Sequence, residues 1–148
     1  MTTIAYRNGT MAGDGRALGF DSVSVGEKTK VFRLCDGTLI GVSSSSLGIP
    51  KAVRDWVEKG MDVSDIPVPR NDDNFEFEAL IVRKNGEAVL LDGNWLPSDP
   101  VKGEYYAIGS GKQYALAALV LGKSAKESVE VAAKLDVWTG GTVTAITH

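Results

Sequence analysis

Three Asn-Gly or Asp-Gly pairs, each between short runs of β-forming residues, constrain this sequence more than any other feature. They are Asn8-Gly9, Asp36-Gly37 and Asn85-Gly86. The residues of these pairs tolerate positive φ, so each pair favours the tight turn of a β-hairpin. Hairpins join neighbouring antiparallel strands. We therefore expect an α+β protein with antiparallel sheets rather than the βαβ alternation of a dinucleotide-binding fold.

Apolar residues at helical spacing predict three helices, over residues 49–59, 111–121 and 124–135. Ser124 and Glu127 have the spacing of a capping box at the start of the third helix. Residues 61–74 predict a loop, and an EF-hand is excluded there because its carboxylate spacing and its glycine are absent. The runs expected to be strands are 2–6, 10–13, 30–34, 38–42, 75–82, 88–91, 105–108 and 142–146.

Length and net charge limit the class of protein. A chain of 148 residues suits one domain, residues 1–148, around a single core. The formal net charge of −3 argues against a nucleic-acid-binding surface. No apolar run reaches the roughly 20 residues of a membrane span. The first residues lack the basic start and apolar core of a signal peptide, so the cytoplasm is the expected location.

The chain has one cysteine, Cys35, and one histidine, His148, which is its last residue. A single cysteine excludes an internal disulfide and a cysteine-cluster metal site, and we expect Cys35 to be packed as a small residue. A Ser-His-Asp or Cys-His arrangement would have to recruit the final residue of the chain. Hydrolytic chemistry, if present, therefore needs a base other than histidine.

Two glycine-containing motifs do not predict a cofactor site. Gly122-Lys123-Ser124 resembles the end of a phosphate-binding loop, but Ala117 stands where that loop needs its first glycine. The Gly-x-Gly runs at 13–15 and 109–111 do not complete a dinucleotide fingerprint. No cluster of metal ligands is evident either. We expect neither a cofactor nor a metal.

Thr2 offers a base without histidine, provided that Met1 is removed. The hydroxyl of an N-terminal threonine can attack while its own α-amine takes the proton. That amine has an ordinary pKa of about 7.7–8.0, which suits a base near neutral pH. While Met1 is attached, the nitrogen is a peptide amide and has no such role.

Short motifs in the order of one known family extend over most of the chain. The sequence resembles the proteasome β-subunit and HslV-type peptidase family of N-terminal-nucleophile hydrolases. The run 136–141 looks like the proteasomal Asp-x-x-Ser-Gly-Gly motif with threonine in place of serine. The other matching blocks are Thr2-Thr3-Ile4, Arg7-Asn8-Gly9, Ala12-Gly13-Asp14-Gly15, Lys30-Val31-Phe32-Arg33-Leu34, Ala107-Ile108-Gly109-Ser110-Gly111, Tyr114-Ala115 and Ala117-Ala118.

The resemblance implies a four-layer αββα sandwich. Helices 111–121 and 124–135 are expected on one outer side of two antiparallel sheets, and helix 49–59 on the other. The family usually has two long helices where this chain has one short helix over 49–59. This shortened helical layer resembles the compact proteasome-like proteins of phages and prophages.

The resemblance also implies roles for individual residues. Thr2 matches the nucleophile and Lys30 the lysine beside its oxygen, where a positive charge favours the alkoxide-like form. Asp14 matches the acid that orients this lysine. Ser110, Asp136 and Thr139 match the polar group around the α-amine. The backbone N–H of the oxyanion hole falls at Ser44 or Ser45, in place of the family's glycine.

We therefore predict a threonine peptidase or amidohydrolase that acts through Thr2 on a peptide substrate. The alternative is a catalytically inactive assembly or structural protein that keeps the fold. Self-association is expected because Trp56, Trp95 and Trp138 present more apolar surface than one core is expected to take up. The resemblance leaves an ATPase partner unassigned.

Overall fold

The hairpins pair their strands into two four-stranded antiparallel sheets in a computed structural model, which describes residues 2–67 and 76–148 except for the side chain of Phe20. The first sheet has the order β10-β2-β1-β9, and the second has the order β5-β6-β7-β8. The first contains β1 (Thr3–Arg7), β2 (Thr10–Gly13), β9 (Tyr105–Gly109) and β10 (Thr144–Thr147). The second contains β5 (Val31–Arg33), β6 (Leu39–Ser44), β7 (Phe77–Val82) and β8 (Ala88–Asp92).

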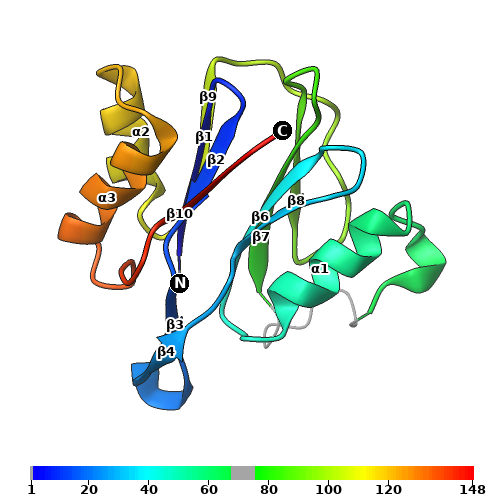
Figure 1. The fold of residues 1–148 in the computed structure, drawn as a ribbon. Helices are drawn as coiled ribbons and strands as arrows, with labels where there is room; N and C mark the ends of the chain where they lie inside the picture. The colour runs from blue at the N-terminus through cyan, green and yellow to red at the C-terminus, as the bar shows by residue number, and fades with distance from the viewer. Residues whose placement is uncertain (1, 68–75) are drawn as a thin grey trace.

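The two sheets face each other, and helices cover both outer faces (Figure 1). Helices α2 (Lys112–Val120) and α3 (Ala125–Leu135) pack on β1 and β2, and α1 (Ile49–Glu58) packs on β6 of the second sheet. The predicted four-layer αββα arrangement is therefore confirmed. The capping box also forms, because Ser124 Oγ accepts the Glu127 N–H and the Glu127 carboxylate accepts the Ser124 N–H.

Strand alternation sends side chains into separate apolar layers. Ile4 on β1 enters the layer between the sheets, whereas Ala5 beside it faces the layer under α2 and α3. On β7, Leu80 faces the space between the sheets, and Ile81 faces α1. Successive side chains of a β-strand point to opposite faces, so both faces of β1 and of β7 pack in apolar layers. Because Ala5 on β1 and Ala12 on β2 have small side chains, α2 and α3 pack close to the first sheet.

The first hairpin turns as its sequence predicts. Asn8 and Gly9 have φ values of 49° and 81°, which fit the left-handed conformation that both residues tolerate. The turn places β1 between β2 and β9, with Thr3 opposite Gly109. The start of the chain therefore lies in the centre of a sheet, against a strand from the last third of the sequence.

A further two-stranded sheet was not predicted. Strands β3 (Arg16–Leu18) and β4 (Ser24–Glu27) pair around a 3-10 turn at Phe20–Ser22. A second 3-10 turn covers Val63–Asp65. The rest of the predicted loop beyond residue 67, and the first residue of the predicted strand 75–82, lie outside the described residues.

Two expectations about single residues are wrong. Trp56 and Trp95 are only 2% and 0% exposed, because they stack edge-to-face with a ring-centroid distance of 5.1 Å in the layer under α1. Of the three tryptophans, Trp138 alone is exposed, at 37%. Cys35 is exposed in the turn between β5 and β6 rather than packed. Two of the three tryptophans therefore belong to the core, and Trp138 alone gives little ground for expecting self-association.

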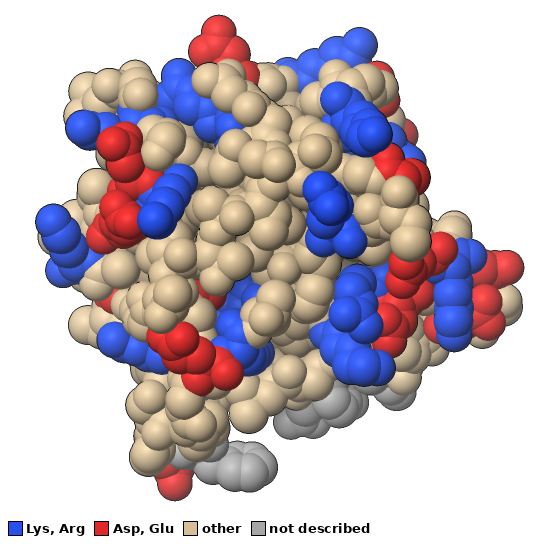
Figure 2. Space-filling view, viewed as in Figure 1, with Lys and Arg blue, Asp and Glu red and all other residues tan. Residues whose placement is uncertain are grey.

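The outer surface carries charges of both signs. On the face shown in Figure 2, Lys and Arg side chains lie among Asp and Glu side chains, with neutral surface between the groups. Within residues 2–67 and 76–148, no helix is long and apolar enough to cross a membrane.

Candidate active site

Asp14 is the centre of a buried polar cluster at the end of β2. Its carboxylate accepts three hydrogen bonds of 3.0 Å, from Lys30 Nζ, the Thr3 N–H and the Gly140 N–H. These donors come from β1, from the residue before β5 and from the loop before β10. One carboxylate therefore ties together four segments that are distant in sequence.

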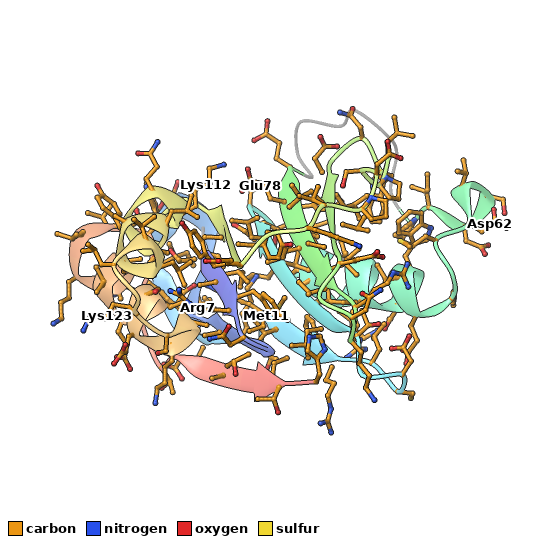
Figure 3. The ribbon with its side chains drawn as sticks, turned by 90° about the horizontal axis from the view of Figure 1, so that it is seen from above. Arg7, Met11, Asp62, Glu78, Lys112 and Lys123 are labelled. Atoms are coloured by element: carbon orange, nitrogen blue, oxygen red, sulfur yellow. The ribbon has the colours of Figure 1, made fainter. Side chains whose placement is uncertain are left out.

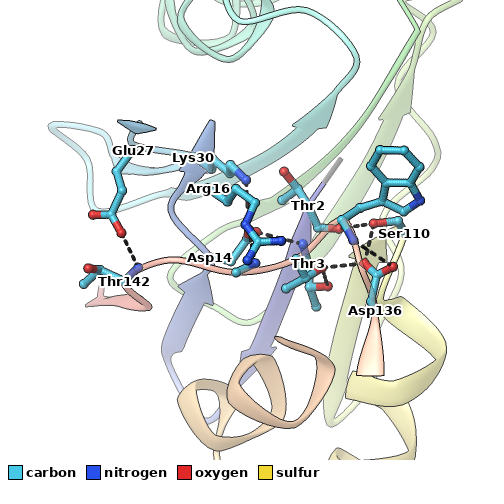
Figure 4. A network of polar contacts seen from close by, with 12 residues as sticks. Thr2, Thr3, Asp14, Arg16, Glu27, Lys30, Ser110, Asp136 and Thr142 are labelled. Carbon is cyan, nitrogen blue, oxygen red and sulfur yellow. Dashed lines mark hydrogen bonds and ion pairs between the residues drawn. The ribbon is translucent and has the colours of Figure 1, made fainter. Parts of the chain in front are cut away.

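Lys30 and Asp14 form an ion pair inside the protein. The two side chains are 1% and 0% exposed. Burial lowers the pKa of the Lys30 ammonium from its ordinary value, and the nearby Asp14 carboxylate opposes this change. Thr2 lies beside the pair and is itself only 1% exposed. Figure 4 shows the end of the Lys30 side chain directed toward Thr2.

A second polar cluster lies on the other side of the first two threonines. The Asp136 carboxylate accepts hydrogen bonds of 2.6 Å from the hydroxyl groups of both Ser110 and Thr139. Ser110 Oγ also lies 3.3 Å from the carbonyl oxygen of Thr2. The structure therefore brings Ser110, Asp136 and Thr139 together from the turn between β9 and α2 and the loop after α3, next to the backbone of Thr2.

Thr3 links the two clusters, and the sequence analysis assigned it no role. Its N–H donates to Asp14, and its hydroxyl lies 2.7 Å from the hydroxyl of Thr139. Thr3 is fully buried. The only signal for it in the sequence was its place directly after Thr2. Its side chain and its N–H hold the first strand in register with the groups around Thr2.

The glycines on either side of Ser110 leave room for the start of the chain. Gly109 has a φ of +97°, and a side chain there would meet the carbonyl of Thr2. A side chain at Gly111 would meet the hydroxyl of Thr3. Both positions therefore need glycine for steric reasons, and Gly109 also for its backbone conformation. The run 109–111, which failed as a dinucleotide motif, instead allows close approach of Ser110 to Thr2.

Glu78 holds this glycine turn from the opposite sheet. Its carboxylate accepts the Gly109 N–H and the Lys112 ammonium, both at 2.8 Å. Burial acts to raise the pKa of Glu78, but the hydrogen bonds from Lys112 and Gly109 together outweigh burial and hold this pKa below its ordinary value. Glu78 and Lys112 lie side by side at the upper edge of the molecule in Figure 3. Sequence reasoning missed both residues because their partners are remote in the chain.

Two clefts open on either side of Ser44 and Ser45. The larger, of about 700 Å³, extends past Ser110 toward Glu78 and Asp92. The smaller, of about 180 Å³, lies between Lys28 and Trp138 on the other side. Because both clefts include Ser44 and Ser45 in their walls, an extended ligand could cross these serines.

Ser44 and Ser45 differ in the contacts that they make. Ser44 ends β6 and its hydroxyl donates to the carbonyl of Ser46 at 2.6 Å. The N–H of Ser45 donates to the carbonyl of Glu76 at 3.2 Å. Use of the Ser45 N–H as an oxyanion donor would therefore require the Glu76 carbonyl to move away.

Within the described ranges, no group of three or more His, Cys, Asp and Glu side chains is arranged to hold a metal ion. The site as described offers hydroxyl groups, a buried ammonium and two carboxylates. These groups suit proton transfer and nucleophilic attack by a hydroxyl.

Solved structures with this fold match the chain over nearly its whole length. The eukaryotic HslV from Trypanosoma brucei superimposes with a TM-score of 0.67 and 18% identity, covering 99% of each chain. The BPH of Thiobacillus denitrificans gives a TM-score of 0.68 and 17% identity, covering 99% of this chain and 96% of that chain. Its complex with epoxomicin gives a TM-score of 0.67 and 17% identity, over 99% and 97% of the two chains.

These similarities confirm the expected resemblance to HslV and proteasome-type proteins at the level of the fold. No protein-family model matches the sequence, and a comparison with curated proteins gives no match either.

Proposed function

We propose that this chain is a threonine peptidase of the N-terminal-nucleophile type. The observation that carries the proposal is the position of Thr2 between two polar clusters, of which the one around Asp14 is buried. The Lys30–Asp14 ion pair lies on one side, and the hydrogen-bonded Ser110, Asp136 and Thr139 lie on the other. The fold that the chain shares with HslV and BPH adds support at the level of the overall architecture.

In the proposed reaction, removal of Met1 first frees the α-amine of Thr2. Thr2 Oγ attacks the carbonyl carbon of a peptide bond, and its proton passes to the amine. The peptide C–N bond breaks, the leaving nitrogen takes this proton, and an ester on Thr2 remains. Water then attacks the ester while the amine accepts a proton from it. The ester bond breaks, the amine passes this proton to Thr2 Oγ, and the acid product leaves the regenerated hydroxyl.

The neighbouring groups have distinct roles in this proposal. The Lys30 ammonium stabilises negative charge on Thr2 Oγ, and Asp14 fixes the position of that ammonium at 3.0 Å. Ser110 and Thr139 both donate hydrogen bonds to Asp136. These three residues form the polar surroundings of the α-amine in this proposal. The backbone N–H of Ser44, or that of Ser45 after the Glu76 carbonyl has moved away, is the proposed donor to the oxyanion.

The test begins with protein whose N-terminal residue is shown by intact mass to be Thr2. This protein should hydrolyse members of a broad set of fluorogenic peptides, and Thr2→Ala should abolish the activity. Thr2→Ser should retain part of it, because a hydroxyl and an amine both remain. The thermal midpoint of the processed protein should also rise with epoxomicin, the ligand of the BPH complex.

The matched control keeps every side chain and changes only the amine. Protein that retains Met1 should be folded and inactive, because its Thr2 nitrogen is an amide. Full activity with Met1 attached would contradict the role of the amine. Lack of activity in processed protein on all substrates would support the inactive structural alternative.

We also propose that the chain self-associates through apolar side chains exposed on α2, rather than through the tryptophans. Tyr114, Val120 and Leu121, in and just after α2, are 41%, 65% and 82% exposed. Apolar side chains gathered on one helix favour contact with a second copy. Light scattering at micromolar concentrations should report an oligomer that Leu121→Lys weakens, and a monomer at all concentrations would contradict this proposal.

A further inference from the structure

The smaller cleft has an unusual charge balance. The ionisable side chains in its wall are Arg16 and Lys28, and both are cations. Among the described residues, neither has a carboxylate within ion-pair distance. We call this space the basic cleft. Its remaining wall includes Leu18, Leu47 and Trp138, which are apolar.

Three carboxylates lie nearby in sequence. Asp21 is exposed and lies outside the wall of the basic cleft, and the other two, Asp14 and Glu27, are already engaged. Asp14 accepts hydrogen bonds from Lys30 and two backbone N–H groups. Glu27 accepts the N–H of Thr142. Neither carboxylate lines the basic cleft, so the positive charge of its wall is not balanced from within that wall.

One hydrogen bond holds the Arg16 guanidinium, and another holds the backbone from which the Lys28 side chain extends. One guanidinium N–H of Arg16 donates to the carbonyl of Val137 at 2.9 Å. The backbone N–H of Lys28 donates to the carbonyl of Gly15 at 2.8 Å. Burial, together with the charge of Lys30, lowers the pKa of Lys28 to about 8. An anion in the cleft would reverse this effect, because it would stabilise the ammonium form.

The basic cleft adjoins the site around Thr2. Ser44 and Ser45 separate it from the larger cleft beside Ser110. Arg16 lies next to Asp14 and Lys30 in the network of Figure 4, close to Thr2. A peptide whose carbonyl reached Thr2 could therefore place a neighbouring side chain between Arg16 and Lys28.

We propose that the basic cleft binds the acidic side chain of a peptide, and that Arg16 and Lys28 make the site select aspartate or glutamate next to the bond attacked by Thr2. The cleft volume of about 180 Å³ fits one side chain of this size. The two cations match a carboxylate, and the apolar wall matches its methylene groups. This inference rests on the proposed function in that it takes the ligand to be a peptide.

Binding is measured first with the Thr2→Ala protein, which separates recognition from turnover. Three labelled peptides identical except for Glu, Gln or Lys at one position are compared by fluorescence anisotropy. We expect the Glu peptide to bind about tenfold more tightly than the Gln peptide, as for a charge-assisted pair, and the Lys peptide to bind least. Equal affinities for the Glu and Gln peptides would overturn the inference.

Variants of Lys28, Arg16 and a lysine outside the basic cleft test whether the preference for the Glu peptide depends on that cleft. Lys28→Gln should reduce the Glu preference to less than about threefold, and Lys28→Arg should keep most of it. Lys126→Gln, on exposed α3, should leave the preference unchanged. If Lys28→Gln and Arg16→Gln both retain the full preference, the assignment to this cleft is wrong.

Failure of this inference is distinguishable from failure of the proposed function. Processed protein that cleaves Glu and Gln peptides equally well would overturn the inference and leave the peptidase intact. Protein that prefers the Glu peptide in binding but cleaves nothing would keep the inference and overturn the peptidase.

Discussion

The Lys30–Asp14 pair gives a stability prediction whose size follows from the contacts. In Asp14→Ala, Lys30 would keep an ammonium that is 1% exposed and has lost its carboxylate. The N–H groups of Thr3 and Gly140 would lose the same acceptor. Removing one partner of a buried ion pair costs about 3–5 kcal/mol. Deprotonation of Lys30 limits that cost, because burial already lowers its pKa.

We therefore expect Asp14→Ala to lower the free energy of unfolding by about 4 kcal/mol at pH 7. For a domain of this size, that change lowers the thermal midpoint by about 10 °C. Urea denaturation followed by circular dichroism measures the free energy, and a thermal scan measures the midpoint. Lys30→Met should also destabilise, because it leaves the Asp14 carboxylate buried with two N–H donors alone.

The double variant with Asp14→Ala and Lys30→Met supplies the control. It buries no charge, so its cost should fall below the sum of the two single changes by at least about 2 kcal/mol. The reasoning is refuted if Asp14→Ala costs less than about 1 kcal/mol, or if the changes add to within about 0.5 kcal/mol.

Three further predictions follow from contacts around the site. Glu78→Ala should lower kcat of the processed protein by about tenfold in peptide assays, because the Gly109 turn loses its acceptor, and an unchanged kcat would count against this role. Gly111→Ala should cost about 2 kcal/mol in urea denaturation because of overpacking, whereas Gly48→Ala, which has open space around it, should be nearly neutral. Lys28 has a lowered pKa of about 8, so the unfolded chain binds more protons above that pH. Stability should therefore rise from about pH 8 to 10, with a smaller slope in Lys28→Gln when measured by urea denaturation across that range.

The sequence predicted those parts of the fold that depend on local signals. The pair Asn8-Gly9 has the backbone conformation that its turn requires, and Ser124 caps its helix through Glu127. Such features act within a few residues, so a single sequence reveals them. Local signals alone do not predict the four-layer arrangement. That prediction came from the resemblance, which rests on family motifs in the same order along the chain.

The features that were missed depend on contacts between distant residues. Strands β3 and β4 are short, and all of β4 is exposed, so neither has the apolar alternation that marks a strand. Trp95 becomes buried only because Trp56 and Phe77 surround it. Glu78 resembles any surface glutamate until Gly109 lies beside it.

The identities of some candidate site residues could be predicted from the sequence, whereas their contacts with one another could not. Thr2, Asp14 and Lys30 were suggested by resemblance, and the structure places the last two 3.0 Å apart. Their pairing has no local signal, because 16 residues separate them and a two-stranded sheet lies between. The clefts, with the charges in their walls, were beyond prediction because each is built from strands and loops that are distant in the sequence.

The strand order of the first sheet has a consequence for how the protein is made. Strand β1 emerges first from the ribosome, yet its neighbour β9 (Tyr105–Gly109) is synthesised about a hundred residues later. Ser110, Asp136 and Thr139 follow still later. Pairing over such a separation is slow, because a long loop must close before the contacts form. A nascent chain therefore carries Thr2 without its polar surroundings, and the site can be completed only when translation has passed Thr139.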